Sequence, residues 1–464
     1  MSAVAVLAQR HLARPTIDKV KQALRISAGE GMAYGGFVGV GDHYVMAFAV
    51  AMQTSSLQLG VLAALPGFLA SSAQLWDQSL VRLLRSRKAV VLVFAAAQGL
   101  IFVPMLLLAL LAWGSPGWWL IFFASLYSTF GALVSPAWGS IMAEIVPQNL
   151  RGSYFSLRGR LSTLATVVTF LLAGVFLNLL VHRALWGFAV LFGAAIGLRF
   201  LSWLFLTRLY ELPAAKTEQQ GSASEFVRGL GSTNLGRYLL FLFAMSFVVN
   251  IASPYFTVYE LRDLHFSYLT FAVLETGSSL AMLFAITHWG HAADKAGNYR
   301  ILAISAYLIP AVPLLWLASS NLAYLGAVQL FSGMAWAGFN LCTVNYLFDA
   351  TSSEDRTKYL AYFNAGNGIA TGAGALLGGS LAPHLPAFLG YQILTLFLIS
   401  GVLRLLVTVV FLPRIHEVRR VSKLPASQLF HILMGGRPVN RRLSHRRHAH
   451  LHHVRPTAPP VSTV

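Results

Sequence analysis

The chain is poor in charge and in cysteine. Only 11% of its 464 residues are charged, whereas 56% are hydrophobic. Because about a quarter of the residues in soluble domains are charged, this composition excludes an ordinary soluble protein and is typical of a protein embedded in lipid. Cys342 is the only cysteine, which excludes an intramolecular disulfide. The sequence also lacks a Walker A motif, which excludes nucleotide hydrolysis through a P-loop.

Long apolar windows dominate what is present. A helix needs about 20 mainly apolar residues to cross the hydrocarbon core, and the chain holds twelve windows of that kind. They cover residues 32–53, 57–75, 88–113, 118–143, 160–182, 184–209, 238–259, 267–289, 299–319, 321–348, 359–382 and 386–412. The predicted fold class is therefore an all-α membrane protein with twelve transmembrane helices. An even number of spans places both termini on one side.

Basic residues indicate which side that is. Of the 34 Lys and Arg residues, 30 lie in alternate gaps between the windows or in the two tails. Because basic loops stay cytoplasmic, we expect a multi-pass protein of the cell membrane with both termini in the cytoplasm. The net charge of +18 could suggest nucleic acid. However, half of it lies in residues 413–464, so anionic lipid headgroups are the simpler partner.

The two halves of the chain are related by duplication. At a constant offset of 205 residues, similar residues recur as the pairs Glu144 and Asp349, Arg151 and Arg356, Tyr154 and Tyr359, Gly174 and Gly379, and Arg199 and Arg404. This predicts two pseudo-symmetric six-helix bundles, 32–209 and 238–412, joined by a polar cytoplasmic linker at 210–237. Residues 1–31 form a cytoplasmic N-terminal tail, and 413–464 form a basic, His-rich tail expected to be disordered. Parallel repeats of this kind place a solute site near mid-membrane between the halves.

The segment 290–300, GHAADKAGNYR, resembles the signature loop of the major facilitator superfamily. Gly290, Asp294, Lys295, Gly297 and Arg300 occupy its Gly, Asp, basic, Gly and basic positions. With the twelve windows, the resemblance covers about residues 32–412. It implies the family's two-bundle fold, and it implies that the segment is a gating loop that helps to close one side during alternating access.

The first half departs from the family pattern. Asp77 matches the Asp of the corresponding loop, but Ala73 replaces its Gly, so the first-half latch is degraded. The fourth window lacks the intramembrane Arg of the family's proton-coupling motif, and the fifth lacks the Gly-Pro signature of its drug antiporters. A multidrug antiporter is therefore disfavoured.

Two carboxylates, Asp42 and Glu275, are predicted deep within spans. An ionised carboxylate is costly in hydrocarbon, so such residues face a cavity, find a partner or carry protons. His43 follows Asp42, but their side chains point about 100° apart on a helix and need not touch. For each acid, proton or substrate coupling and a structural hydrogen bond are both open.

Amides and aromatic residues supply further candidates for a central cavity, which spans 7, 10 and 11 line in the family that the chain resembles. The amides are Asn250, Asn340, Asn345, Asn364 and Asn367. The aromatics are Tyr44, Tyr127, Trp138, Tyr255 and Trp336. Helix packing is the alternative for the amides, and interfacial belts or core packing for the aromatics. For Arg199 and Arg404, which lie within spans 6 and 12, a shared structural role is favoured over substrate contact.

These features predict a secondary active transporter of a small organic solute that works by alternating access and is coupled to protons through Asp42 or Glu275. The alternative is a transporter-derived membrane sensor or assembly factor without transport, against which the intact 290–300 segment argues. An enzyme is not expected, because two isolated carboxylates do not make a catalytic set. We expect no cofactor, metal or nucleic acid. The expected partners are the substrate, protons or another coupling ion, and the bilayer, with the chain a monomer.

Overall fold

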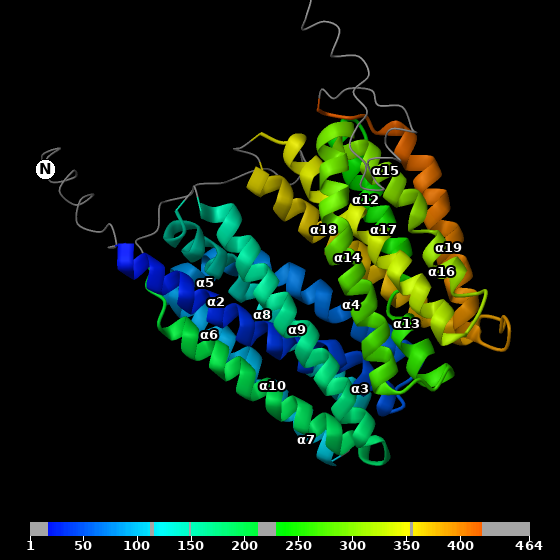
Figure 1. The fold of residues 1–464 in the computed structure, drawn as a ribbon, viewed down its shortest axis with the longest axis horizontal. Helices are drawn as coiled ribbons and strands as arrows, with labels where there is room; N and C mark the ends of the chain where they lie inside the picture. The colour runs from blue at the N-terminus through cyan, green and yellow to red at the C-terminus, as the bar shows by residue number, and fades with distance from the viewer. Residues whose placement is uncertain (1–16, 112–115, 148–149, 212–228, 353–355, 420–464) are drawn as a thin grey trace, which may run out of the picture.

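The computed structural model describes residues 17–111, 116–147, 150–211, 229–352 and 356–419, and these are almost entirely helical (Figure 1). Within them the β pairing is limited to an isolated bridge between Phe388 and Tyr391. Ten helical segments of this part are long and apolar enough to cross a membrane. The predicted windows 32–53 and 359–382 are not among the ten, but the helices that carry them pack inside the bundles with the others.

The N-terminal half forms one bundle. Its elements are α2 (Ile17–Val40), η1 (Asp42–Tyr44), α3 (Val45–Ala51), α4 (Ser56–Ala73), η2 (Gln74–Trp76), α5 (Asp77–Leu84), α6 (Arg87–Leu100), α7 (Phe102–Leu111), α8 (Pro116–Ile145), α9 (Arg151–Leu179), η4 (Val181–Arg183) and α10 (Ala184–Thr207). Polar side chains cap the N-termini of two of its helices. Ser55 and Gln58 form a capping box on α4, and the Ser86 side chain accepts a hydrogen bond from the Ala89 amide on α6. Such caps satisfy amides that the first helical turn leaves unpaired.

The C-terminal half forms the second bundle. Its elements are α12 (Asn234–Asn250), α13 (Tyr255–Val258), the π-helical turn η5 (Tyr259–Asp263), α14 (Tyr268–Ala296), α15 (Asn298–Leu308), α16 (Ala311–Leu315), α17 (Leu322–Asp349), α18 (Arg356–Leu381), η6 (Ala382–His384), α19 (Gln392–Phe411) and η7 (Leu412–Arg414). Thr233, Ser267 and Asn321 cap α12, α14 and α17 in the same way.

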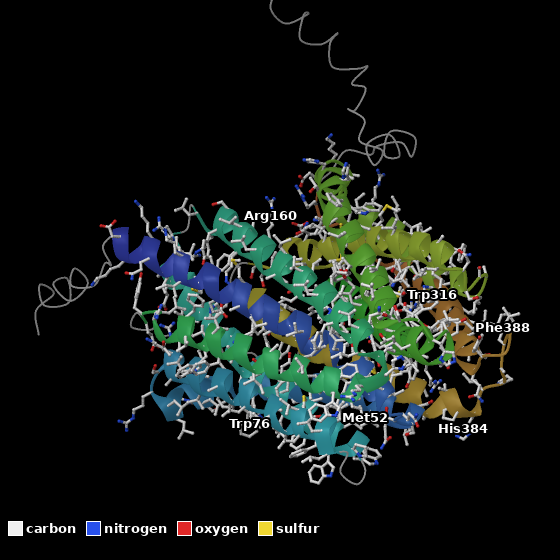
Figure 2. The ribbon with its side chains drawn as sticks, turned by 60° about the horizontal axis from the view of Figure 1, so that its bottom comes forward. Met52, Trp76, Arg160, Trp316, His384 and Phe388 are labelled. Carbon is white, nitrogen blue, oxygen red and sulfur yellow. The ribbon has the colours of Figure 1, made fainter. Side chains whose placement is uncertain are left out.

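The bundles join at one end and separate at the other. One apolar core includes residues of both halves, among them Phe48, Phe188, Tyr255 and Phe271. Two other cores each belong to a single half, around Met142 in the first and around Phe241, Phe339 and Tyr346 in the second. Figure 1 shows the resulting V, closed near α3 and α13. We call these the joined end and the splayed end; Met52 and His384 lie at the joined end, away from Arg160 (Figure 2).

Glycines allow the close contact at the joined end. A Cβ on Gly379 of α18 would lie 2.8 Å from the Cα of Gly60 in α4, and a Cβ on Gly174 of α9 would lie 2.7 Å from the Cβ of Ala272 in α14. Gly174 and Gly379 are one of the pairs offset by 205 residues. The duplication thus places a glycine at each of the two symmetric crossings between halves, where small residues let backbones approach.

Some segments differ from the sequence prediction. α2 begins at Ile17, so residues 17–31 continue the first helix rather than forming a separate tail. The first span is interrupted at Gly41, because the chain turns there through η1 before α3. The linker segment 212–228 and the His-rich segment 420–464 lie outside the described residues.

Candidate functional site

A cavity of about 400 Å³ lies between the two bundles. We call it the central cavity. Residues of the first span, α9 and α14 line it, including His43, Thr166, Phe170, Glu275, Thr276 and Met282. The Oγ1 atom of Thr276 is buried and has no hydrogen-bond partner within the described residues. A mainly apolar cavity with a few polar groups suits a small organic solute.

Asp42 and His43 have different surroundings, although they are neighbours in the turn between α2 and α3. His43 lines the central cavity, with its ring centroid 5.1 Å from that of Phe170. Asp42 interacts with the side chain of Tyr127, a residue buried in α8. Both side chains of the pair are solvent-accessible. The two side chains also interact electrostatically with each other, so the break in the helix places an acid and a base close together while each meets a further partner.

Glu275 borders two cavities. It lines the central cavity and also a pocket of about 260 Å³ within the second bundle, which we call the C-bundle pocket. Nε2 of Gln329, from α17, donates a hydrogen bond of 3.0 Å to its Oε1. A carboxylate in this position faces both the central cavity and the pocket behind it.

The C-bundle pocket is lined largely by polar side chains. Its walls include Ser253, Glu275, Trp316, Gln329, Ser332 and Arg404. Arg404 is only 2% exposed; its Nε donates to Ser400 Oγ at 3.1 Å, and its Nη2 donates to the Val249 carbonyl at 3.2 Å. No acidic side chain of the described residues forms an ion pair with it.

Glu260 is a buried carboxylate that the sequence analysis missed. It lies on η5, is fully buried, and neither of its oxygens has a hydrogen-bond partner among the described residues. It interacts electrostatically with Glu275. The seventh window, 238–259, ends one residue before Glu260, so the apolar pattern alone leaves this acid between spans. The apolar run 255–258 before it is the signal that the helix continues.

Glu30 was missed for the same reason, because the first window began after it. Its Oε2 receives a 2.5 Å hydrogen bond from Arg158 Nη2, and its Oε1 receives one of 3.1 Å from Ser202 Oγ. Arg199 Nη1 donates to the same Ser202 at 2.8 Å. Arg158 also stacks over the Trp138 ring at 4.2 Å. These contacts connect α2, α9 and α10 through a chain of charged groups.

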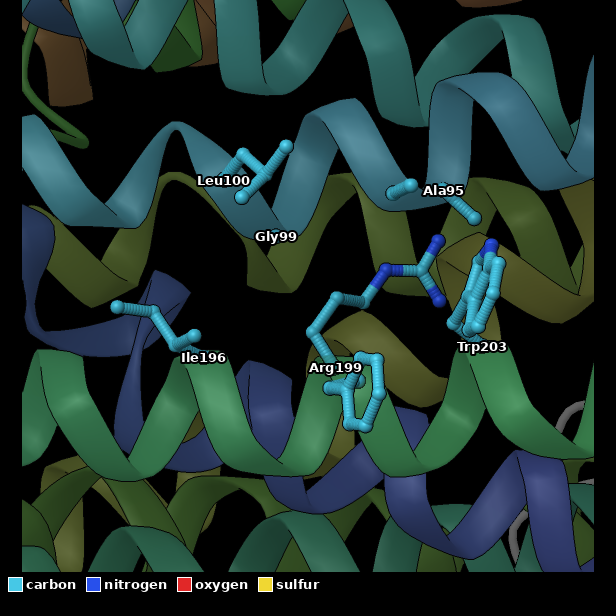
Figure 3. A pocket seen from close by; sticks show the side chains of 8 residues that line it. Ala95, Gly99, Leu100, Ile196, Arg199 and Trp203 are labelled. Atoms are coloured by element: carbon cyan, nitrogen blue, oxygen red, sulfur yellow. The ribbon is translucent and has the colours of Figure 1, made fainter.

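Arg199 also borders a groove of about 220 Å³ between α6 and α10. Figure 3 shows its guanidinium extending from α10 beside Trp203 toward α6, with Ala95, Gly99 and Leu100 opposite. Leu100 is 64% exposed, so the groove opens on the outer surface of the bundle. The groove is apolar apart from Arg199, and nothing in it favours binding of a polar solute.

The candidate amides do not gather in one cavity. Asn250 donates to the Ser246 carbonyl at 2.8 Å and to Thr371 Oγ1 at 3.4 Å, and Asn367 accepts a hydrogen bond from Ser246. These contacts join α12 to α18, which is the packing alternative. The remaining three lie elsewhere: Asn340 contacts Met282 of α14, Asn364 is exposed and Asn345 is partly buried.

The candidate aromatics are also divided. Tyr44 and Tyr255 are fully buried at the joined end, where their hydroxyls donate to the carbonyls of Phe170 and Ser56. Trp138 lines a pocket within the first bundle, and Trp336 lines the C-bundle pocket.

The signature segment is mostly helical rather than a loop. α14 continues through Gly290, Asp294 and Lys295 to Ala296, and α15 begins at Asn298. Gly297 between them has φ +93°, a backbone conformation that favours glycine. Asp294 and Lys295 are exposed, and Arg300 lies in the first turn of α15. Asp77 is the first residue of α5, and its side chain lies outside the described part of the structure.

The sequence did not predict a cluster of charged side chains that joins the start of α6 to α8 and to Glu211, which follows α10. Arg87 donates to both oxygens of Glu144 at 2.8 Å, and its Nε lies 3.3 Å from Glu211 Oε1. Burial raises the pKa of the Glu211 carboxyl, but hydrogen bonds from Ser86 and from the amides of Arg87 and Lys88 outweigh it, so that pKa lies below its usual value. In the second half Asp349, the counterpart of Glu144, accepts from Asn298 at 2.6 Å. In each half, an acidic side chain near the end of one helix thus bonds to a polar or basic side chain at the start of another helix.

No group of three or more His, Cys, Asp or Glu side chains in the described ranges is arranged to hold a metal ion. The cluster of histidines near the C-terminus lies outside those ranges.

Comparisons with known proteins agree with this architecture. The sequence profile described as "Major Facilitator Superfamily" matches residues 31–286 and 238–451. No curated protein sequence matches the chain. Among solved structures, the nucleoside transporter NupG has a TM-score of 0.65 at 12% identity over 86% of this chain and 99% of its own. A D-xylose-proton symporter has a TM-score of 0.65 at 15% identity over 85% and 98%.

A bacterial homologue of the human lysosomal transporter Spinster, solved in an inward-facing and unoccupied conformation, has a TM-score of 0.57 at 13% identity over 87% of this chain and 99% of its own. At these identities the likeness concerns the fold. The profile match covers most of the sequence, in both halves. The chain belongs to the major facilitator superfamily of membrane transporters.

Proposed function

We propose that the chain is a secondary active transporter that moves a small organic solute by alternating access, driven by protons that Glu275 carries. Family membership supports transport of a small solute. The observation that carries the proton coupling is the position of Glu275, on the wall of the central cavity and beside the buried Glu260. Both bundles line that cavity, so a group in it experiences their movement.

The conformation supports an inward-facing assignment. The bundles separate toward the end that carries the basic segments around Arg87, Arg151 and Arg300 (Figure 1). Because such segments face the cytoplasm, the central cavity opens to the cytoplasm in this state, with both termini on that side. Exchange with the other side requires the contacts at the joined end to separate.

Glu275 is surrounded by groups that make its protonation matter. Gln329 donates to it from α17, Glu260 approaches from η5, Arg404 lies across the C-bundle pocket and His43 lies across the central cavity. An ionised carboxylate cannot be closed into an apolar interior at low cost. A proton on Glu275 removes that cost, so the loaded transporter closes around solute and proton together.

The test uses the purified full chain in liposomes. Uptake of radiolabelled uridine, D-xylose and lactate is measured with and without an inward proton gradient, in wild type and in Glu275→Gln. We expect at least one solute to accumulate in wild type only when the gradient is present. Glu275→Gln should lose accumulation but keep exchange of labelled for unlabelled solute, because exchange needs no net proton transfer.

The matched control is Asp18→Asn, which removes an exposed carboxylate from the first turn of α2, outside both the cavity lining and the 290–300 segment. This variant should still accumulate the solute against the solute's concentration gradient. Accumulation by Glu275→Gln with the wild-type dependence on pH would contradict the assignment of Glu275. A sensor or assembly factor without transport would move none of the solutes in any variant.

A further inference from the structure

Arg199 and Arg404 are equivalent in the duplication, but their surroundings are not. Arg199 reaches the carboxylate of Glu30 through Ser202. At the offset of 205 residues, the counterparts of Glu30 and Ser202 are Leu235 and Val407. The second half therefore retains the arginine and lacks both the acid and the hydroxyl that serve it in the first half.

Arg404 is a buried cation without a counter-ion. It is 2% exposed, makes its hydrogen bonds to one hydroxyl and one carbonyl, and forms no ion pair among the described residues. A guanidinium stays protonated in proteins, and burying an unpaired charge is costly. Because Arg404 lines the C-bundle pocket, an anion in that pocket would supply the missing charge.

Trp316 adds a second unsatisfied group to the same pocket. It is 1% exposed, and its indole Nε1 has no hydrogen-bond partner within the described residues. The side-chain hydroxyls of Ser253, Ser278 and Ser332, which also line the pocket, make no side-chain hydrogen bonds in that part of the chain. A buried donor without a partner costs free energy. Trp316 and Ser332 are buried, Ser278 is half-buried and Ser253 is exposed. The pocket therefore offers free donors, the indole N–H above all, to a ligand that accepts hydrogen bonds.

We propose that the C-bundle pocket binds a small organic carboxylate, whose carboxylate group pairs with Arg404 and accepts a hydrogen bond from Trp316. The volume of about 260 Å³ admits a compact acid, and the rings of Phe256, Trp316 and Trp336 supply apolar surface for its carbon skeleton. Transport of this acid rests on the function proposed above, but its binding does not.

The same geometry links the anion to the proton. Glu275 lies on the wall of the pocket that Arg404 also lines, without forming an ion pair with it. When Glu275 is ionised it repels a carboxylate ligand, and Glu260 beside it adds to that repulsion if it is also ionised. His43 is the titratable group across the central cavity. A proton on Glu275 removes the repulsion, so proton and anion strengthen each other's binding, as thermodynamic linkage requires.

Binding is tested on the full chain in lipid nanodiscs, with no gradient present. The probes are lactate and benzoate, each compared with its neutral amide, lactamide or benzamide. Tryptophan fluorescence and the apparent melting temperature are followed as each probe is added. We expect at least one carboxylate to bind saturably and raise the melting temperature, and its amide to bind at least about tenfold more weakly, because the amide cannot neutralise Arg404.

Three variants assign the binding to the pocket. Arg404→Lys loses the planar fork that holds a carboxylate at two points, so affinity should fall about tenfold or more. Trp316→Phe removes the indole N–H together with one ring of the side chain, and it should weaken binding several-fold to tenfold. This variant tests the pocket if Arg404→Lys does not fold. Arg199→Lys is the matched control in the first bundle and should bind the carboxylate as wild type does.

The proposal is overturned if neither carboxylate binds, if amides bind as well as acids, or if Trp316→Phe and folded Arg404→Lys bind as wild type does. Failure of the transport function gives a different result. In that case the carboxylate binds in nanodiscs with the variant pattern above, yet no solute accumulates in liposomes under a proton gradient.

Discussion

At the residue scale, the stability of the first bundle depends on a network of charged and polar side chains from three helices, α2, α9 and α10. The ion pair of Glu30 with Arg158 is largely buried, with side-chain exposures of 6% and 17%. Arg199 reaches the same acid through Ser202. Because one carboxylate serves two arginines, its loss leaves two cations inside the bundle.

Glu30→Gln should therefore destabilise the fold strongly, by about 3 kcal/mol. The expected cause is the uncompensated charge left on Arg158, so Arg158→Gln in the same chain should restore part of the loss. Thermal unfolding of both single variants and the double variant gives the coupling energy between the two side chains. Strictly additive losses would show that the pair contributes nothing of its own.

Glu211 provides a test by pH, because it lies outside the spans. Its folded pKa lies below its usual value, owing to hydrogen bonds from Ser86 and the amides of Arg87 and Lys88 that outweigh the effect of burial. A depressed folded pKa adds stability above the unfolded value, about 4.3, and that stability is lost as the pH falls through the folded pKa. Wild type should therefore melt above Glu211→Gln at pH 7, with the gap closing below about pH 4. A gap that is the same at both pH values would rule out this contribution.

From the sequence, Glu275 could be placed inside a helix, whereas Glu30 and Glu260 at the window edges could not; the role of Glu275 stays a prediction. Glu275 was identified because it interrupts an apolar run. Glu30 and Glu260 were not, because hydropathy sets the ends of a span from average polarity, while a helix continues as long as its backbone hydrogen bonds do. Contacts between distant residues, such as the approach of Arg199 to Glu30, depend on how helices pack, which a single sequence does not specify.

At the element scale, the two inter-half crossings control which end of the molecule is closed. Gly379 meets Gly60 between α18 and α4, and Gly174 meets Ala272 between α9 and α14. A side chain at either crossing must push the bundles apart at the joined end. The conformations open at that end are then favoured, because they relieve the overlap.

Gly379→Val and Gly174→Val should shift the population toward opening of the joined end. Spin labels on cysteines introduced at Gln53 and His384, in a Cys342→Ala background, report the separation there by double electron–electron resonance. Both variants should populate longer distances than the parent chain. Gly139→Val is the matched control, because a Cβ at Gly139 meets nothing within 4 Å. An unchanged distance distribution in both test variants would contradict the role of the crossings.

Helix positions were predictable from the sequence, but helix breaks were less so. The windows agree with the long helices because each needs a long apolar run to remain in lipid. The turn at Gly41 and the π-helical turn at η5 were not foreseen, since hydropathy is the same for a straight and a broken helix. The signature segment 290–300 was expected as a loop, yet only Gly297 leaves the helical conformation between α14 and α15.

At the scale of the whole molecule, duplication explains both the symmetry and its exceptions. The offset of 205 residues predicts two bundles, and each bundle has its own core, with a third core shared at the joined end. The halves have diverged in chemistry: the first connects its buried arginine to an acid through Ser202, and the second leaves Arg404 facing a pocket. Under the proposal made above, this divergence assigns stability to one bundle and ligand binding to the other.

The central claim is that solute and proton cross together through Glu275. The most direct measurement is the internal pH of liposomes that contain the full chain and a trapped pH-sensitive dye. When the solute that accumulates in the uptake assay is added outside without an imposed gradient, wild type should acidify the interior as solute enters, and Glu275→Gln should not. Solute entry without acidification in wild type, or equal acidification in Glu275→Gln, would contradict the account.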